Sequence, residues 1–183
     1  MVKDRYFIAV VLPQDIREEV YNFKKIMAEQ HHACHAFKSQ AHITLHMPFK
    51  WGSSKRGELD QALAQMAAGL SPFEVALQDF GVFEPLVIFI DVAENKDLRD
   101  LRSKVLLEMR KRNIYNGDYK KVGFQPHVTI AFRDLRKVNF YEAWETFKEQ
   151  KYERTFSVSG ISLLKYQSDH WQENGTFPFM DTN

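Results

Sequence analysis

Two short motifs carry the side chains best suited to chemistry, His42-Ile43-Thr44-Leu45 and His127-Val128-Thr129-Ile130. Successive side chains of a β-strand point to opposite faces, so each histidine shares a face with the threonine two residues later. Histidine can take or give a proton near neutral pH, and threonine hydroxyls can donate hydrogen bonds to phosphate oxygens. Two imidazoles and two hydroxyls around one point therefore suit attack at phosphorus, in which one group removes a proton and another supplies one.

A single His-x-Thr motif is weak evidence, because strand histidines are often structural and threonine is common in sheets. These two motifs, however, occupy equivalent places in an order of elements that occurs twice: strand, helix, motif strand, helix, strand. The expected ranges are 6–12, 15–30, 41–45, 59–70 and 72–77 in the first copy and 86–92, 98–109, 126–130, 140–147 and 155–161 in the second.

The repeat keeps a nearly constant shift along the chain. The shift is 82, 85 and 83 residues for the landmark pairs Phe7 and Phe89, His42 and His127, and Phe73 and Phe156. It predicts a duplicated unit of about eighty residues. We expect one domain, 1–183, with repeat halves of roughly 1–84 and 85–183, strands exchanged between the lobes, and the motif strands meeting at one cleft. The alternative is that β-α-β patterns are common and that the two copies align by chance.

Alternation along the motif strands predicts further contacts for a substrate. In the first copy it places His46 in the cleft, while Pro48 is expected to end the strand pairing before Lys50. In the second copy it places Arg133 on the face of the histidine, where the guanidinium could add a charge-assisted bond to a phosphate. A solvated arginine at the end of a strand is the competing interpretation.

Aromatic side chains supply the expected contacts for a base: Phe7 in the first strand, and Tyr166 and Trp171 near the end of the last one. Stacking of a base on an aromatic ring is worth ~1–3 kcal/mol where it occurs. Packing in the core is an equally good interpretation of Tyr166 and Trp171.

The segment His31-His32-Ala33-Cys34-His35 has the composition of a metal site, but no second ligand group follows at the spacing of a zinc finger. The sequence also lacks the glycine-rich patterns that cradle nucleotide triphosphates or dinucleotides. We therefore expect no metal and no cofactor.

Composition limits the classes of partner. Twenty-five basic and 24 acidic side chains leave a net charge of +1, so the protein has no overall positive field that would attract duplex DNA. A nucleic acid would have to be bound by a local group of residues. No apolar run of about 18 residues and no signal peptide are present, and a single cysteine suits a reducing compartment. We expect a cytoplasmic monomer with no membrane contact and no obligate protein partner.

At the two motifs the chain resembles the 2H phosphoesterase superfamily, and within it the bacterial branch known as 2'-5' RNA ligase or RNA 2',3'-cyclic phosphodiesterase. The resemblance includes the flanking Pro126 and Ala131 and the opening Arg5-Tyr6-Phe7-Ile8-Ala9-Val10, and it covers nearly the whole chain. It implies an α+β fold, a bilobed pseudo-twofold duplication in which two antiparallel sheets line a central groove with helices outside.

The resemblance also implies an activity and a set of roles. The expected reaction is the opening of 2',3'-cyclic phosphate ends of RNA or nucleotides to a 2'-phosphate. His42 and His127 are then the acid-base pair, and Thr44 and Thr129 donate hydrogen bonds to the phosphate. One departure concerns Phe132, which stands where close relatives often have an arginine, so that the family's phosphate-binding arginine has no direct counterpart.

Three other functions fit the same motifs. Some relatives run the reaction in reverse as 2'-5' RNA ligases, and a cyclic phosphate of ADP-ribose is another substrate of this chemistry. A protein that binds RNA or a nucleotide without catalysis would belong to a different class. The motifs do not distinguish between these substrates, because they are expected to contact the phosphate and no other part of the ligand.

Overall fold

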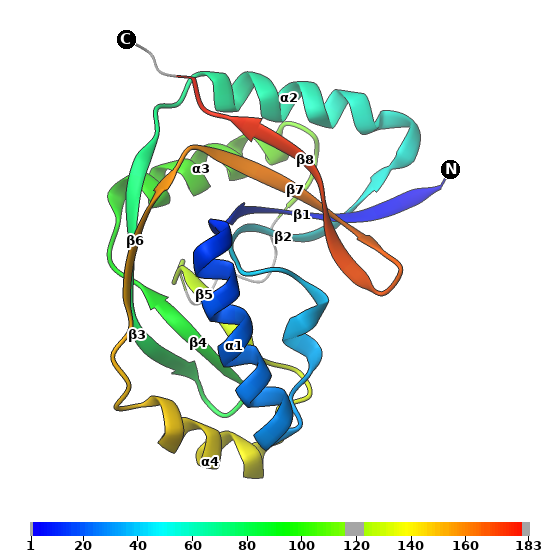
Figure 1. The fold of residues 1–183 in the computed structure, drawn as a ribbon. Helices are drawn as coiled ribbons and strands as arrows, with labels where there is room; N and C mark the ends of the chain where they lie inside the picture. Colours follow the sequence, from blue (N-terminus) through cyan, green and yellow to red (C-terminus); the bar gives the residue numbers. More distant parts are fainter. Residues whose placement is uncertain (1, 116–122, 181–183) are drawn as a thin grey trace.

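A computed structural model describes residues 2–115 and 123–180 (Figure 1). In this part of the chain, helices surround two four-stranded antiparallel sheets, which confirms the α+β class. Sheet A has the strand order β2-β1-β7-β8 and sheet B the order β5-β4-β3-β6. The strands are β1 (Lys3–Val11), β2 (His42–Gly52), β3 (Phe73–Phe83), β4 (Val87–Val92), β5 (His127–Ala131), β6 (Glu153–Val158), β7 (Gly160–Gln167) and β8 (His170–Pro178). The helices are α1 (Gln14–His31), α2 (Arg56–Ala68), α3 (Lys96–Arg110) and α4 (Lys137–Phe147), with short 3-10 turns η1 (His35–Lys38) and η2 (Ser53–Lys55).

Each sheet takes strands from both halves of the chain. Strand β3 follows β1 and β2 in sequence but lies in sheet B, where it pairs with β4 and β6. Strands β7 and β8 come from the end of the chain and complete sheet A, where β7 pairs with β1. The two sheets are therefore built by exchange, and neither can be assembled from one half alone.

The helices that follow the first strand of each half also cross over. Helix α1 follows β1 of sheet A and packs against β5 of sheet B, whereas α3 follows β4 of sheet B and packs against β2 of sheet A. Figure 1 shows α2 running along β8 at one end of the molecule and α4 at the other end. No helix among the described residues has both the length and the apolar character needed to cross a membrane.

Local sequence explains where the crossing helices begin and which face they bury. Pro13, which cannot continue the ladder of β1, directly precedes α1, and Asn95 caps α3 by accepting a hydrogen bond from the backbone N–H of Leu98 at 2.9 Å. Helix α3 then buries residues at helical spacing, so its apolar stripe faces the sheets. Its buried residues are Leu98, Leu101, Val105 and Met109.

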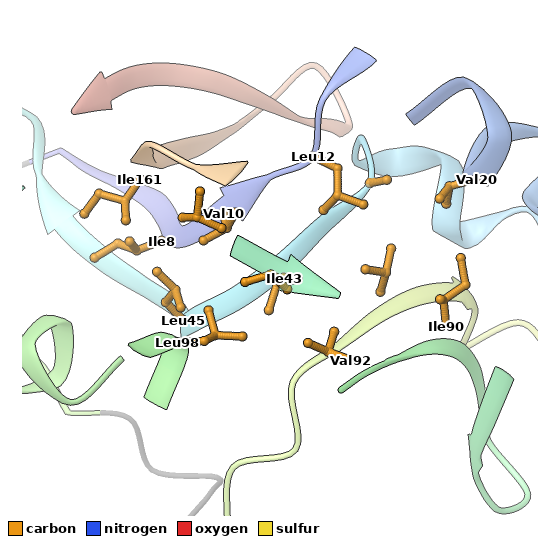
Figure 2. Close-up of a cluster of buried hydrophobic side chains, with 14 of the residues drawn as sticks. Ile8, Val10, Leu12, Val20, Ile43, Leu45, Ile90, Val92, Leu98 and Ile161 are labelled. Atoms are coloured by element: carbon orange, nitrogen blue, oxygen red, sulfur yellow. The ribbon is translucent and has the colours of Figure 1, made fainter. Parts of the chain in front are cut away.

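The core is continuous from one sheet to the other, as Figure 2 shows for a group of side chains drawn from β1, β2, β4, β7, α1 and α3. The two motif strands both contribute their apolar positions to it. Ile43 and Leu45 are 0% and 1% exposed, and Val128 and Ile130 are both fully buried. The predicted alternation is thus confirmed at these four positions, and the histidines and threonines between them lie on the opposite face.

Strand β2 does not end at Pro48 as predicted. It continues to Gly52 and pairs with β1 as far as Lys3, including the pair of Arg5 with Lys50. Proline is tolerated because β2 is an edge strand and because the register shifts on either side of Ile8, so that Pro48 sits in an irregular stretch rather than in a regular ladder.

The single strand expected at 155–161 is wrong, because this stretch contains the end of β6 in sheet B and the beginning of β7 in sheet A. The other predicted elements differ from the observed ones mainly at their ends. The helix expected at 15–30 spans Gln14–His31, and the strand expected at 86–92 spans Val87–Val92. Strand β8 was not expected, since 168–178 has no sustained apolar alternation. Most of its side chains are exposed, so pairing with β7 rather than burial defines it as a strand.

Gly81 gives a test of the packing beneath one motif. It pairs with Phe89 across β3 and β4, and a Cβ atom at residue 81 would lie 2.5 Å from Cε2 of the Phe89 ring. Because this ring is buried, we expect Gly81→Ala to lower the free energy of unfolding by ~1–3 kcal/mol through overpacking. Gly57→Ala in α2 is the matched control, because nothing lies within 4 Å of its added Cβ atom. Urea denaturation of both variants checks this, and equal stabilities would contradict it.

Candidate active site

A cavity of about 200 Å³ opens where β2 and β5, the edge strands of the two sheets, lie against each other. It receives all four motif side chains, which are partly accessible between buried neighbours. The structure therefore brings together residues that are 85 positions apart in the chain. The lining residues are Phe7, His35, Ala36, Lys38, Ser39, His42, Thr44, Met47, Pro48, Val87, His127, Thr129, Phe132, Arg133 and Trp171.

The two histidines are oriented in the same way. Nδ1 of His42 lies 2.7 Å from the carbonyl oxygen of Gln40, and Nδ1 of His127 lies 2.8 Å from the carbonyl oxygen of Gln125. A carbonyl can only accept, so Nδ1 is the protonated nitrogen of each ring. In both cases the acceptor is the glutamine two residues earlier, and Nε2 is left as the nitrogen that can exchange protons in the cavity.

Aromatic rings fix the tilt of both imidazoles. The Phe7 ring lies 4.8 Å from that of His42 with an interplanar angle of 45°, and the Phe89 ring lies 4.9 Å from that of His127 at 47°. Phe83 adds an edge contact to His127 at 5.0 Å. Since stacked and tilted contacts restrict ring rotation, each histidine is held by one hydrogen bond and at least one aromatic neighbour.

The ladders around the two motifs match residue for residue. Thr44 pairs with Ala9 in sheet A, and Thr129 pairs with Phe89 in sheet B. Equivalent positions of β1 and β4 are thus 80 residues apart, so the sequence alignment of Phe7 with Phe89 is two residues out of register. The supporting phenylalanines come from non-equivalent positions and still reach their histidines at similar distances.

The surroundings of the two rings differ in charge. Burial lowers the pKa of His42 to about 4, although the hydrogen bond to Gln40 opposes this, and the charges of Lys24 and His127 lower it further. Burial also lowers the pKa of His127, but there the bond to Gln125 and the nearby carboxylate of Asp91 both favour the protonated ring. Both histidines are therefore neutral at pH 7 in the unliganded protein, and His127 has the environment that better accepts a proton.

His46 does not line the cavity, contrary to the prediction from alternation. It pairs with Ile8, which is fully buried in the main core, whereas Thr44 pairs with the next residue of β1, Ala9. The bulge at Leu45 places one extra residue between Thr44 and His46, so their side chains point to opposite faces. His46 is 1% exposed, packs against Phe49 and bonds the carbonyl of Met47 through Nδ1.

The other predicted contact residues lie in or beside the cavity. Phe7, Trp171 and Arg133 line it, and Tyr166 stands behind Trp171 with ring centroids 5.0 Å apart. Trp171 in turn meets the Phe7 ring edge-on at 4.8 Å. Strand β5 ends at Ala131, so Arg133 reaches the cavity through a turn rather than through the regular alternation that was assumed.

The sequence interpretation missed His35 and Lys38, which reach the cavity from η1. A signal is present in the sequence, because His35 belongs to the histidine-rich segment immediately before the first motif, but the composition of that segment suggests a metal site rather than a wall of the cavity. In the structure its residues disperse: His31 is buried, Cys34 is exposed and His35 faces the cavity. Among the described residues, no three His, Cys, Asp or Glu side chains are grouped so that they could hold a metal ion.

Comparison with known proteins identifies relatives. The profile of the family described as the 2'-5' RNA ligase superfamily matches residues 12–170. A protein of Bacillus pumilus (strain SAFR-032) named "Putative phosphoesterase" is 26% identical over 143 residues, which are 77% of each chain. E. coli LigT complexed with 3'-AMP has a similar fold, with a TM-score of 0.72, 16% identity, and coverage of 98% of this chain and 100% of LigT. TT0787 of Thermus thermophilus gives a TM-score of 0.68 and 17% identity, covering 95% and 97% of the two chains.

Titration of the rings tests this description of the cavity. We expect His42 to stay neutral, with its proton on Nδ1, until the pH falls toward about 4, because burial disfavours its charged form. ¹⁵N NMR of the imidazoles reads both the tautomer and the midpoint. A His42 ring that gained its second proton near the ordinary value of ~6.5 would show that the ring is solvated rather than enclosed.

Proposed function

The chain belongs to the 2'-5' RNA ligase superfamily, and from this premise we propose that it is a phosphoesterase that opens 2',3'-cyclic phosphate ends of RNA or nucleotides to 2'-phosphates. Family membership agrees with the resemblance seen in the sequence. Further support comes from LigT, a protein of similar fold whose structure contains 3'-AMP, a nucleotide with its phosphate on the ribose.

One observation carries the proposal. Two imidazoles, each fixed by a bond from Nδ1 to a carbonyl and each two residues before a threonine, line the same 200 Å³ cavity. A structural role would not require two accessible rings with the same free nitrogen in one cavity. A pair of proton carriers flanked by two neutral hydroxyl donors is what displacement at a phosphodiester needs.

In the proposed reaction, a water molecule attacks phosphorus while the bond from phosphorus to the ribose 3' oxygen breaks. Nε2 of one histidine takes a proton from the water, and Nε2 of the other gives a proton to the departing 3' oxygen. The hydroxyls of Thr44 and Thr129 donate hydrogen bonds to the two non-bridging oxygens, whose charge they stabilise. This scheme requires no metal, because imidazoles move the protons and hydroxyls stabilise the charge.

Charges behind the rings support an assignment of the two roles. The amine of Lys24, 4% exposed, donates hydrogen bonds to the carbonyls of Ala36 at 2.9 Å and Ser39 at 2.8 Å, in the segment that leads to His42. In sheet B the residue paired with His127 is Asp91, which carries the opposite charge. We therefore assign neutral His42 as the base and protonated His127 as the acid, since a lysine disfavours a second positive charge and a carboxylate favours one.

The base of the nucleotide is assigned to the wall formed by Phe7 and Trp171. The Phe7 ring adjoins His42, Trp171 packs against Phe7, and Tyr166 supports Trp171 from behind. The guanidinium of Arg5 lies over Tyr166 at 4.8 Å and Trp171 at 5.5 Å, which braces the wall by cation-π contacts. Stacking on such a wall is tolerant of base identity, so we propose little discrimination among nucleotides.

The histidines can be tested directly. We expect His42→Ala and His127→Ala each to reduce hydrolysis of a 2',3'-cyclic nucleotide by at least ~10²-fold, measured with a chelator present, because each removes one proton transfer. The exposed His32, which lies outside the cavity, supplies the control variant His32→Asn. Undiminished turnover in both alanine variants would remove the mechanism. Tight binding of a cyclic-ended oligonucleotide without any product would instead indicate a binding protein.

The pH profile tests the assigned roles. Activity needs neutral His42 and protonated His127, so kcat/KM should rise with pH through about 4 and fall as the pH passes the lowered pKa of His127, below its usual ~6.5. Asp91→Asn removes the carboxylate that favours protonated His127, so the alkaline limb should move to lower pH while the acidic limb stays. Movement of the acidic limb alone would reverse the assignment.

A further inference from the structure

We infer that the cavity contains a second anion site, formed by Arg133 with His35 and Lys38, which binds a phosphate group of the substrate other than the one that reacts. The inference rests on the proposed function, because it concerns another part of the same substrate. The substrate would be a nucleotide that has a cyclic phosphate at the 2' and 3' oxygens and a further phosphate on the 5' oxygen.

Arg133 and His35 come from distant parts of the chain and meet in the cavity. Nη1 of Arg133 lies 3.3 Å from Nε2 of His35, although the residues are 98 positions apart. A guanidinium only donates, so the ring nitrogen accepts and His35 orients the arginine. The Arg133 guanidinium also lies 5.4 Å from the centre of the Phe132 ring. Two contacts thus direct this exposed side chain toward the cavity.

The backbone at Arg133 is held in an unusual conformation. Its φ is +65°, and the N–H of Asp134 bonds the carbonyl of Phe132 at 2.8 Å, which closes a three-residue γ-turn around Arg133. A side chain at positive φ is disfavoured, and such turns persist only where the surroundings enforce them. A glycine or asparagine would fit this position with less strain. The presence of arginine is therefore explained by what its guanidinium binds.

A carboxylate clamps this turn to η1. The side chain of Asp134 accepts hydrogen bonds from the backbone N–H groups of Cys34 and His35, both at 2.8 Å. These bonds tie the end of β5 to the segment that carries His35 and Lys38. The carboxylate is occupied by backbone donors, and among the described residues Arg133 forms no ion pair with an acidic side chain.

Charged side chains of both signs surround His35. Lys38 pairs with Asp169 at 2.7 Å, and the same carboxylate accepts a hydrogen bond from Tyr166. Burial lowers the pKa of His35, and the positive charges of Arg133 and Lys38 lower it further, each by more than Asp134 or Asp169 raises it. An anion placed between Arg133 and His35 would relieve this repulsion and could gain a second charged donor from the ring.

The position of the site relative to the motifs defines the ligand. Arg133 follows Thr129 by four residues, just beyond the end of β5, whereas the aromatic wall of Phe7 and Trp171 lies on the side of sheet A. We therefore place a ribose whose cyclic phosphate sits between the two histidines with its base toward the wall and its 5' side toward Arg133. Two sources supply a phosphate there: a terminal phosphate of a mononucleotide, or the phosphodiester that continues an RNA strand.

The experiment compares three substrates that share the reacting group. They are adenosine 2',3'-cyclic phosphate, the same nucleotide with a 5'-phosphate, and a dinucleotide that ends in a 2',3'-cyclic phosphate. Wild-type protein should show a kcat/KM about tenfold or more higher for the second or third substrate than for the first, as expected for charged hydrogen bonds to a phosphate. Preference for only one of the two tells whether a terminal phosphate or a chain phosphodiester is bound.

Variants of Arg133 decide whether the site produces this preference. Arg133→Gln should bring the ratio of kcat/KM values to within about twofold of unity, and Arg133→Lys should retain part of it, because the charge remains without the paired donors. Arg136→Gln, an exposed arginine three residues away, is the matched control and should keep the wild-type ratio. Absence of any preference in the wild type, or an equal loss on all three substrates in Arg133→Gln, would overturn the inference.

Binding of product-like ligands separates this inference from the proposed function. Calorimetric titration should give about tenfold or more tighter binding of adenosine 2',5'-bisphosphate than of adenosine 2'-phosphate, with the difference lost in Arg133→Gln. If no substrate is hydrolysed but this difference is found, the phosphoesterase assignment fails and the anion site stands. If hydrolysis occurs but the two ligands bind equally tightly in wild-type protein, the anion site fails and the enzyme stands.

Discussion

The cavity depends on one constraint, which is that the edge strands of two separate sheets meet with their apolar side chains in a shared core. Ile43 and Leu45 on β2, and Val128 and Ile130 on β5, satisfy this constraint from both sides. Because a strand alternates, burial of these residues leaves the intervening side chains on the opposite faces. Hydrophobic packing on one face of each strand therefore positions the polar groups on the other face. The carbonyls of Gln40 and Gln125 then set the rotation of each ring.

Near-symmetry accounts for the pair of imidazoles in one cavity, and departures from it account for the different roles that we propose for them. The ladders place Thr44 opposite Ala9 and Thr129 opposite Phe89 in the same way, so the two halves present similar groups to one point. Their second layers are unlike, since a buried lysine lies behind one ring and a carboxylate beside the other. The rims of the cavity differ as well: sheet A supplies an aromatic wall, and the turn after β5 supplies a guanidinium. In our proposal, this asymmetry determines which histidine acts as the base and on which side of the cavity the nucleobase lies.

Much of the fold and the four motif positions could be predicted from the sequence, because period-two alternation and a repeated order of elements are local signals. The prediction for His46 is wrong, because a bulge adds one residue to β2 between Thr44 and His46 and no residue type in the sequence indicates it. Arg133 was placed in the cavity for the wrong reason, because the strand ends before it and a turn at positive φ redirects the chain. The place of His35 in the cavity could not be predicted, because it depends on a hydrogen bond to the carboxylate of Asp134, about a hundred residues away, which no local sequence pattern indicates.

The exchange of strands has a consequence for synthesis on the ribosome. Strand β1 is made long before its neighbour β7, so sheet A cannot close until β7 has been translated. Until then β1 and β2 expose an unpaired edge, a condition that favours association with other nascent chains or with chaperones. Ladders between such distant segments also slow folding, because a long loop must close before they gain any stability. His42 and Thr44 are thus made early, but sheet A, to which their strand belongs, is complete only after β7 and β8 have been translated.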